Sequence, residues 1–67
     1  MAEGATGRFR VRRDAYCWQV GGGHRHLLRG TLLEGRILRR NAQVRRVVID
    51  TGQGVLTLNE EDLEPAG

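Results

Sequence analysis

Apolar and polar residues alternate strictly near the start of the chain, over residues 8–12 (RFRVR). A period of two places Phe9 and Val11 on one face of a strand and the arginines on the other. Residues 16–20 (YCWQV) also alternate, and they are rich in side chains that favour strands. Both segments are therefore predicted to be strands, and the three glycines at 21–23 are predicted to form a hairpin loop after the second one.

The middle of the chain carries three apolar doublets five residues apart, a spacing that fits neither a helix nor a strand. A helix over residues 24–34 would include a glycine, which weakens a helix by about 1 kcal/mol relative to alanine. A strand over residues 31–39 is favoured, because a glycine such as Gly35 inside a short apolar run often marks a bend or bulge in a curled sheet. On that strand Leu32 and Leu38 lie on the outer face, where apolar surface needs a partner.

The last third of the chain predicts a hairpin followed by a helical turn. Residues 44–49 are rich in β-branched side chains, and after a turn that contains two glycines residues 55–58 return as the partner strand. Residues 59–62 (NEED) resemble a capped helical turn in which the Asn59 side chain accepts a backbone N–H. Leu63 then returns to the core.

Several short strands, a hairpin and one helical turn together indicate an all-β fold. The expected architecture is a small five-stranded barrel of the SH3-like or Sm-like kind, with one short helical turn near the C-terminus. This resemblance is to a widespread architecture, and the chain shows no motif of a particular family. At 67 residues it forms one domain. We expect a disordered tail over residues 1–7, a single β-barrel domain over residues 8–64 and a second tail over residues 65–67.

All 11 basic residues are arginines, and they are unevenly placed. Residues 8–46 hold 11 arginines against two acids, a balance of +9, whereas the rest of the chain is acidic. Arginine presents a rigid fork of donors to phosphates and carboxylates, although a GC-rich genome would also favour arginine over lysine. The distribution indicates either a polyanionic partner or self-association, in which the acidic C-terminal segment of one copy meets the basic stretch of another.

The arginines of residues 8–12 would lie about 7 Å apart on one strand face, close to the spacing of successive phosphates in a nucleic acid. Tyr16 and Trp18 could stack on bases, although core packing is the stronger expectation for Trp18. The first hypothesis is therefore a small basic module that binds DNA or RNA through phosphates with little base specificity. The competing interpretation is a solvated, salt-bridged surface. The candidate nucleic-acid-binding residues are Arg8, Arg10, Arg12, Arg13, Arg36, Arg39, Arg40, Arg45, Arg46, Tyr16 and Trp18.

The alternative hypothesis is a protein-interaction or assembly module, either a homo-oligomer or a subunit of a larger complex. Its interface would use the outer leucines and the acidic C-terminal segment, and its arginines would pair with carboxylates of the partner.

Other classes of function are not expected. Cys17, His24 and His26 could share a metal, but a structural zinc site needs four ligands, and a fourth is missing unless Asp14 or a second subunit supplies it. No metal and no cofactor are therefore predicted. No nucleophile has a neighbouring base, and no catalytic residue or enzyme activity is predicted unless a site forms between subunits. A lone cysteine and the lack of a long apolar run predict a cytoplasmic protein that does not enter a membrane.

Overall fold

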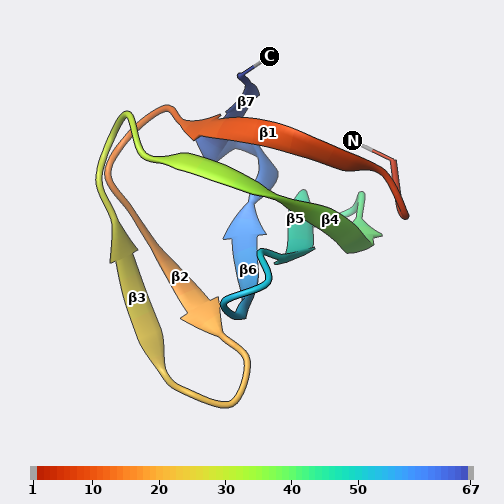
Figure 1. The fold of residues 1–67 in the computed structure, drawn as a ribbon, viewed down its shortest axis with the longest axis horizontal. Helices are drawn as coiled ribbons and strands as arrows, with labels where there is room; N and C mark the ends of the chain where they lie inside the picture. Colours follow the sequence, from red (N-terminus) through yellow and green to blue (C-terminus); the bar gives the residue numbers. More distant parts are fainter. Residues whose placement is uncertain (1, 67) are drawn as a thin grey trace.

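The alternating segments form a seven-stranded antiparallel sheet in the computed structural model, which describes residues 2–66 (Figure 1). In chain order the strands are β1 (Thr6–Val11), β2 (Ala15–Gln19), β3 (His24–Leu27), β4 (Leu32–Asn41), β5 (Arg46–Asp50), β6 (Val55–Asn59) and β7 (Leu63–Pro65). A 3₁₀ turn, η1 (Glu60–Asp62), connects β6 to β7. In space the order is β3-β2-β6-β5-β4-β1-β7. Among these residues there is no helix long and apolar enough to cross a membrane.

The predicted all-β class is confirmed, but seven strands are present instead of five, and the pairings describe an open sheet that ends at β3 and β7. Residues 24–34 do not form the alternative helix, because β3 and the start of β4 occupy them. The helical turn lies where it was predicted, as η1. Asn59 precedes it, but its side chain makes no capping hydrogen bond, so that detail of the prediction is wrong. Leu63 is buried as expected.

At both ends of the chain, regular structure extends beyond the predicted domain boundaries. β1 begins at Thr6, two residues before the predicted start of order, and the chain before it also bonds to β4. The Gly4 N–H donates to the Ile37 carbonyl at 2.6 Å, and the Arg40 N–H donates to Glu3 Oε1 at 3.0 Å. Pro65, assigned to a tail by the sequence, is the last residue of β7. Residues 1 and 67 of the predicted tails lie outside the described part.

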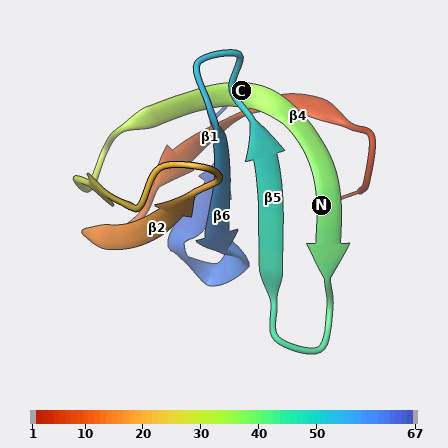
Figure 2. The same cartoon turned by 90° about the horizontal axis from the view of Figure 1, so that it is seen from below.

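β4 belongs to both halves of the sheet. It pairs with β1 over residues 32–36 and with β5 over residues 36–41. Figure 2 shows β4 curving around the molecule between these two partners. The pairing register shifts between Ile37 and Arg39, which marks a β-bulge. The bend predicted around Gly35 is therefore confirmed, with the bulge a little further along the strand.

One core lies inside the curled sheet, and every strand contributes to it. Its members are Phe9, Val11, Cys17, Leu27, Leu33, Ile37, Val47, Ile49, Leu56, Leu58 and Leu63. The predicted inward faces of residues 8–12 and 31–39 are both observed. Leu32 and Leu38 are exposed, as the strand alternation requires.

Gly35 allows the two halves of the sheet to meet. A Cβ atom at this position would clash with the backbone carbonyl oxygen of Asp50 in β5, and it would lie 3.0 Å from Cγ2 of Ile49. The clash involves a backbone atom that is held in the β5–β6 pairing, so a side-chain rotation cannot relieve it. Only glycine permits this close approach of β4 to the end of β5.

Gly35→Ala should therefore destabilise the fold by about 2 to 3 kcal/mol, the upper range for overpacking a core. In a domain of this size the loss lowers Tm by about 10 °C or more. Gly22→Ala is the matched control, because its new Cβ meets no atom within 4 Å and its backbone is not in the left-handed region. Thermal unfolding followed by circular dichroism would measure both variants. Equal Tm values would show that Gly35 does not fix the bend.

Candidate nucleic-acid interface

Two rows of side chains cross the outside of the sheet. Residues directly opposite one another in paired antiparallel strands point to the same face. From β3 to β4, the first row consists of His24, Trp18, Thr57, Val48 and Arg39. The second row begins with His26 and Tyr16 and ends with Asn59, Arg46 and Asn41. We refer to the surface formed by these ten residues as the outer face.

Both predicted stacking residues are exposed on the outer face. Tyr16 is 72 % exposed and Trp18 is 58 % exposed. The expectation that Trp18 packs in the core is therefore wrong. Alternation along β2 turns the buried Ala15 and Cys17 inward, and it turns the two large rings outward.

Each exposed ring contacts a histidine of β3. Tyr16 stacks on His26 with ring centroids 4.6 Å apart and an angle of 19° between the planes. Trp18 lies against His24 with centroids 4.0 Å apart and an angle of 36°. From the sequence the two histidines were considered as metal ligands, and these contacts were not predicted. The hairpin register would have revealed them, because the glycine loop places His24 opposite Trp18 and His26 opposite Tyr16.

A shallow groove of about 130 Å³ lies beside the two rings, on the β6 and β5 side of β2. Its lining residues are Tyr16, Trp18, Arg46, Thr57, Leu58 and Asn59. The structure thus brings Tyr16, Trp18 and Arg46 into one site, although Arg46 comes from a distant part of the sequence. Thr57 and Asn59, which the sequence did not indicate, add a hydroxyl and an amide.

Four of the predicted arginines are paired with carboxylates of the same chain. The ion pairs are Arg8–Glu34 at 3.5 Å, Arg10–Glu64 at 3.7 Å, Arg13–Asp62 at 3.3 Å and Arg40–Glu60 at 3.1 Å. The last of these has two hydrogen bonds, one from Nε and one from Nη2 of the guanidinium. The arginine row predicted for residues 8–12 is therefore interleaved with acids from β4 and β7.

The remaining five predicted arginines have no ion pair within residues 2–66. Arg39 and Arg46 lie on the outer face, and Arg36 lies at its margin, opposite Asp50. Arg12 and Arg45 lie elsewhere and line a second groove. The structure consequently does not unite the predicted residues into one surface. It separates Tyr16, Trp18, Arg36, Arg39 and Arg46 from the rest.

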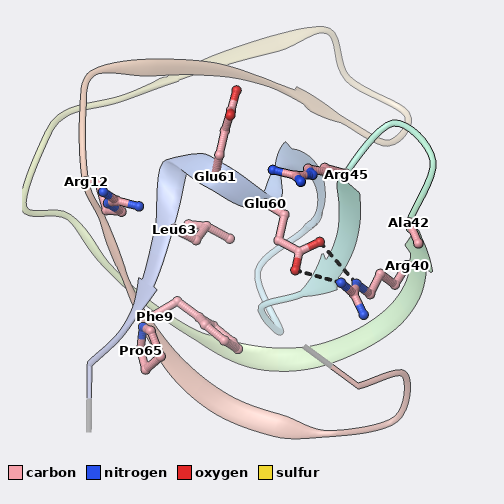
Figure 3. Close-up of a pocket in the computed structure, with 9 residues that line it drawn as sticks. All are labelled: Phe9, Arg12, Arg40, Ala42, Arg45, Glu60, Glu61, Leu63 and Pro65. Atoms are coloured by element: carbon pink, nitrogen blue, oxygen red, sulfur yellow. Dashed lines mark hydrogen bonds and ion pairs between the residues drawn. The ribbon is translucent and has the colours of Figure 1, made fainter.

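The second groove has a volume of about 640 Å³ and lies between β1, β7, η1 and the β4–β5 turn (Figure 3). Figure 3 shows the side chains of Arg12, Arg45 and Glu61 around its opening, with the Arg40–Glu60 pair at one side. Charges of both signs line this groove. It is therefore less suited to a polyanion than the outer face.

Cys17 lies on the opposite side of β2 from the rings. Its thiol is buried and donates a hydrogen bond to the Arg25 carbonyl at 3.4 Å. Burial raises the pKa of the Cys17 thiol, and the charge of Arg25 offsets this shift only in part. Because His24 and His26 point to the outer face, Cys17 cannot join them around a metal. Among residues 2–66 no three histidine, cysteine or carboxylate side chains gather into a metal site.

Comparison of the chain with models of protein families, with curated proteins and with solved structures finds no match. The geometry of the site is therefore the basis for assigning a function.

The Arg13–Asp62 pair should stabilise the fold more than the exposed Arg8–Glu34 pair. Asp62 is buried, with only 8 % of its surface exposed, so loss of Arg13 leaves a carboxylate in a poorly hydrated place. Arg13→Ala is expected to cost about 1 kcal/mol, and Arg8→Ala, which breaks an exposed pair, is expected to cost less than about 0.5 kcal/mol. Urea unfolding would measure both. Equal losses would contradict a structural role for Arg13.

Proposed function

We propose that this protein is a nucleic-acid-binding module that uses the outer face. The observation that carries the proposal is the groove in which two exposed aromatic rings meet Arg46, an arginine that forms no ion pair with any of residues 2–66. Large exposed rings on a sheet beside guanidinium groups are the features with which proteins bind bases and phosphates together. We also propose that the protein works in the cytoplasm and has no catalytic residue.

We further propose that the core of the fold is an SH3-like barrel. β1, β4, β5, β6 and β7, with η1 before the last strand, would be the five strands of an SH3-like barrel. The hairpin of β2 and β3 would then be an addition that extends the sheet on the β6 side. In this arrangement the aromatic rings belong to the added hairpin, and Arg39 and Arg46 belong to the barrel.

Single-stranded nucleic acid is the partner that fits these rings. Bases in a duplex are stacked on one another and cannot lie flat on a protein side chain, whereas the unstacked bases of single strands can. The guanidinium groups of Arg36, Arg39 and Arg46 would contact phosphates. Phosphate contacts position a strand without reading its sequence, so most of the interface is expected to have little base specificity.

The paired arginines should contribute less to binding. A phosphate that approaches Arg8 or Arg10 competes with a carboxylate already within 4 Å of the guanidinium. The acidic side chains also repel the phosphate. The contact set proposed from the structure is therefore Tyr16, Trp18, Arg36, Arg39 and Arg46.

The assembly hypothesis has less support. Glu60, Asp62 and Glu64 of the acidic segment form ion pairs within the chain, so a second copy would have to displace those arginines. Leu32 and Leu38 are 64 % and 45 % exposed and remain available to a protein partner.

Trp18→Ala should weaken binding to a single-stranded oligonucleotide by about tenfold or more, because base stacking on an aromatic side chain contributes about 1 to 3 kcal/mol. Leu32→Ala is the matched control, since it also removes a large exposed apolar side chain but lies on the β1 side of β4. Fluorescence anisotropy with a ten-nucleotide oligothymidine would measure both affinities. Duplex DNA should bind more weakly than the single strand. No binding at low salt, or equal effects of the two variants, would end the proposal.

The salt dependence should identify which arginines touch phosphates. If Arg36, Arg39 and Arg46 each neutralise one phosphate of a single strand, log K falls with log salt with a slope of about −2. Arg46→Gln and Arg39→Gln should each make the slope shallower by about 0.7, whereas Arg8→Gln should leave it unchanged. Binding isotherms at several salt concentrations would give the slopes. An equal change in Arg8→Gln would place the phosphates along β1 instead.

A further inference from the structure

The groove beside Tyr16 and Trp18 is large enough for part of one planar base. Its volume is about 130 Å³, and a cavity of about 150 Å³ is known to hold one benzene molecule. The groove is therefore too small to enclose an extended organic molecule, but one edge of an unstacked base that projects from a strand could enter it.

The two walls of the groove are suited to the faces of a planar ring. Tyr16 and Trp18 stand on β2, and their contacts with His26 and His24 hold them from the β3 side. Arg46 stands on β5, two strands away, which is a separation of about 10 Å. A base that stacks on a ring at one side and on a guanidinium at the other needs two spacings of about 3.5 to 4 Å, which together fill most of that distance. A base in the groove would lie between an aromatic ring and a guanidinium, both of which stack on planar groups.

The floor of the groove carries polar groups on β6, the strand between the two walls. Thr57 lies opposite Trp18, and Asn59 lies opposite Arg46. The Asn59 side chain precedes η1 but does not cap it, so its amide remains available to a ligand. A primary amide presents a donor beside an acceptor, the pattern that matches N6 and N7 of adenine.

We propose that the groove binds one unstacked base of a single-stranded nucleic acid, preferentially adenine, and that Asn59 reads its edge. The inference rests on the proposed function and deepens it. Most of the interface binds without base specificity, and the groove alone selects one nucleotide. The selected base stacks between the β2 rings and the face of the Arg46 guanidinium, and the edge of the base faces Asn59. The N–H groups in the plane of the same guanidinium can still donate to a phosphate.

The test compares four oligonucleotides by fluorescence anisotropy. Each has ten nucleotides, and all are thymine except for a central adenine, cytosine, guanine or thymine. The oligonucleotide with adenine should bind about tenfold more tightly than the all-thymine one, the effect of one good bidentate contact. Asn59→Ala should abolish this preference, so that the oligonucleotide with adenine and the all-thymine one bind with equal affinity. The same series with uridine ribonucleotides would show whether RNA or DNA is the better source of the base.

The controls separate the base site from the rest of the interface. Gln53→Ala removes an exposed amide from the β5–β6 turn, outside this groove, and should keep the adenine preference. Thermal unfolding would confirm that Asn59→Ala folds, as expected for a side chain that does not cap η1. Equal affinity for all four oligonucleotides would overturn the base site and leave the proposed function intact, as would an adenine preference that survives Asn59→Ala. A failure of every oligonucleotide to bind would remove both.

Discussion

The close contact between Gly35 and the Asp50 carbonyl is the constraint on which the curled sheet depends. β4 can pair with β1 at one end and with β5 at the other only if the strands approach tightly where the partners change. That curvature places side chains from all seven strands in one core. It also turns the opposite faces of β2, β6 and β5 outward as a continuous surface. The proposed binding site is therefore a consequence of a glycine that does not itself belong to it.

Ion pairs within the chain neutralise more of the arginines than the separation of charges along the sequence indicates. The basic stretch and the acidic C-terminal segment are separate in the sequence, but η1 and β7 fold back onto β1 and β4 and bring the two together. Exposed ion pairs of this kind stabilise a fold only weakly. Their larger effect is on the distribution of positive potential, because they neutralise part of the basic stretch, whereas Arg36, Arg39 and Arg46 form no ion pair with any of residues 2–66.

Local patterns predicted much of the fold, and long-range pairing accounts for the rest. The inward faces of residues 8–12 and 31–39 follow from strand alternation, because only one face of each is consistently apolar or small. Trp18 could not be placed in the same way, since both faces of β2 carry apolar side chains. The groove and the ion pairs could not be predicted either, because they require β2 to lie beside β6 and β7 beside β1.

An open sheet leaves two strand edges, and both are poorly suited to joining another sheet. β3 is four residues long and carries His24, Arg25 and His26, whereas β7 is three residues long and ends at Pro65. Short strands, polar side chains and proline all oppose the addition of a further strand. Free edges of this kind would disfavour fibril-like aggregation even at the high local concentrations that the proposed binding of several copies to one strand of nucleic acid would produce.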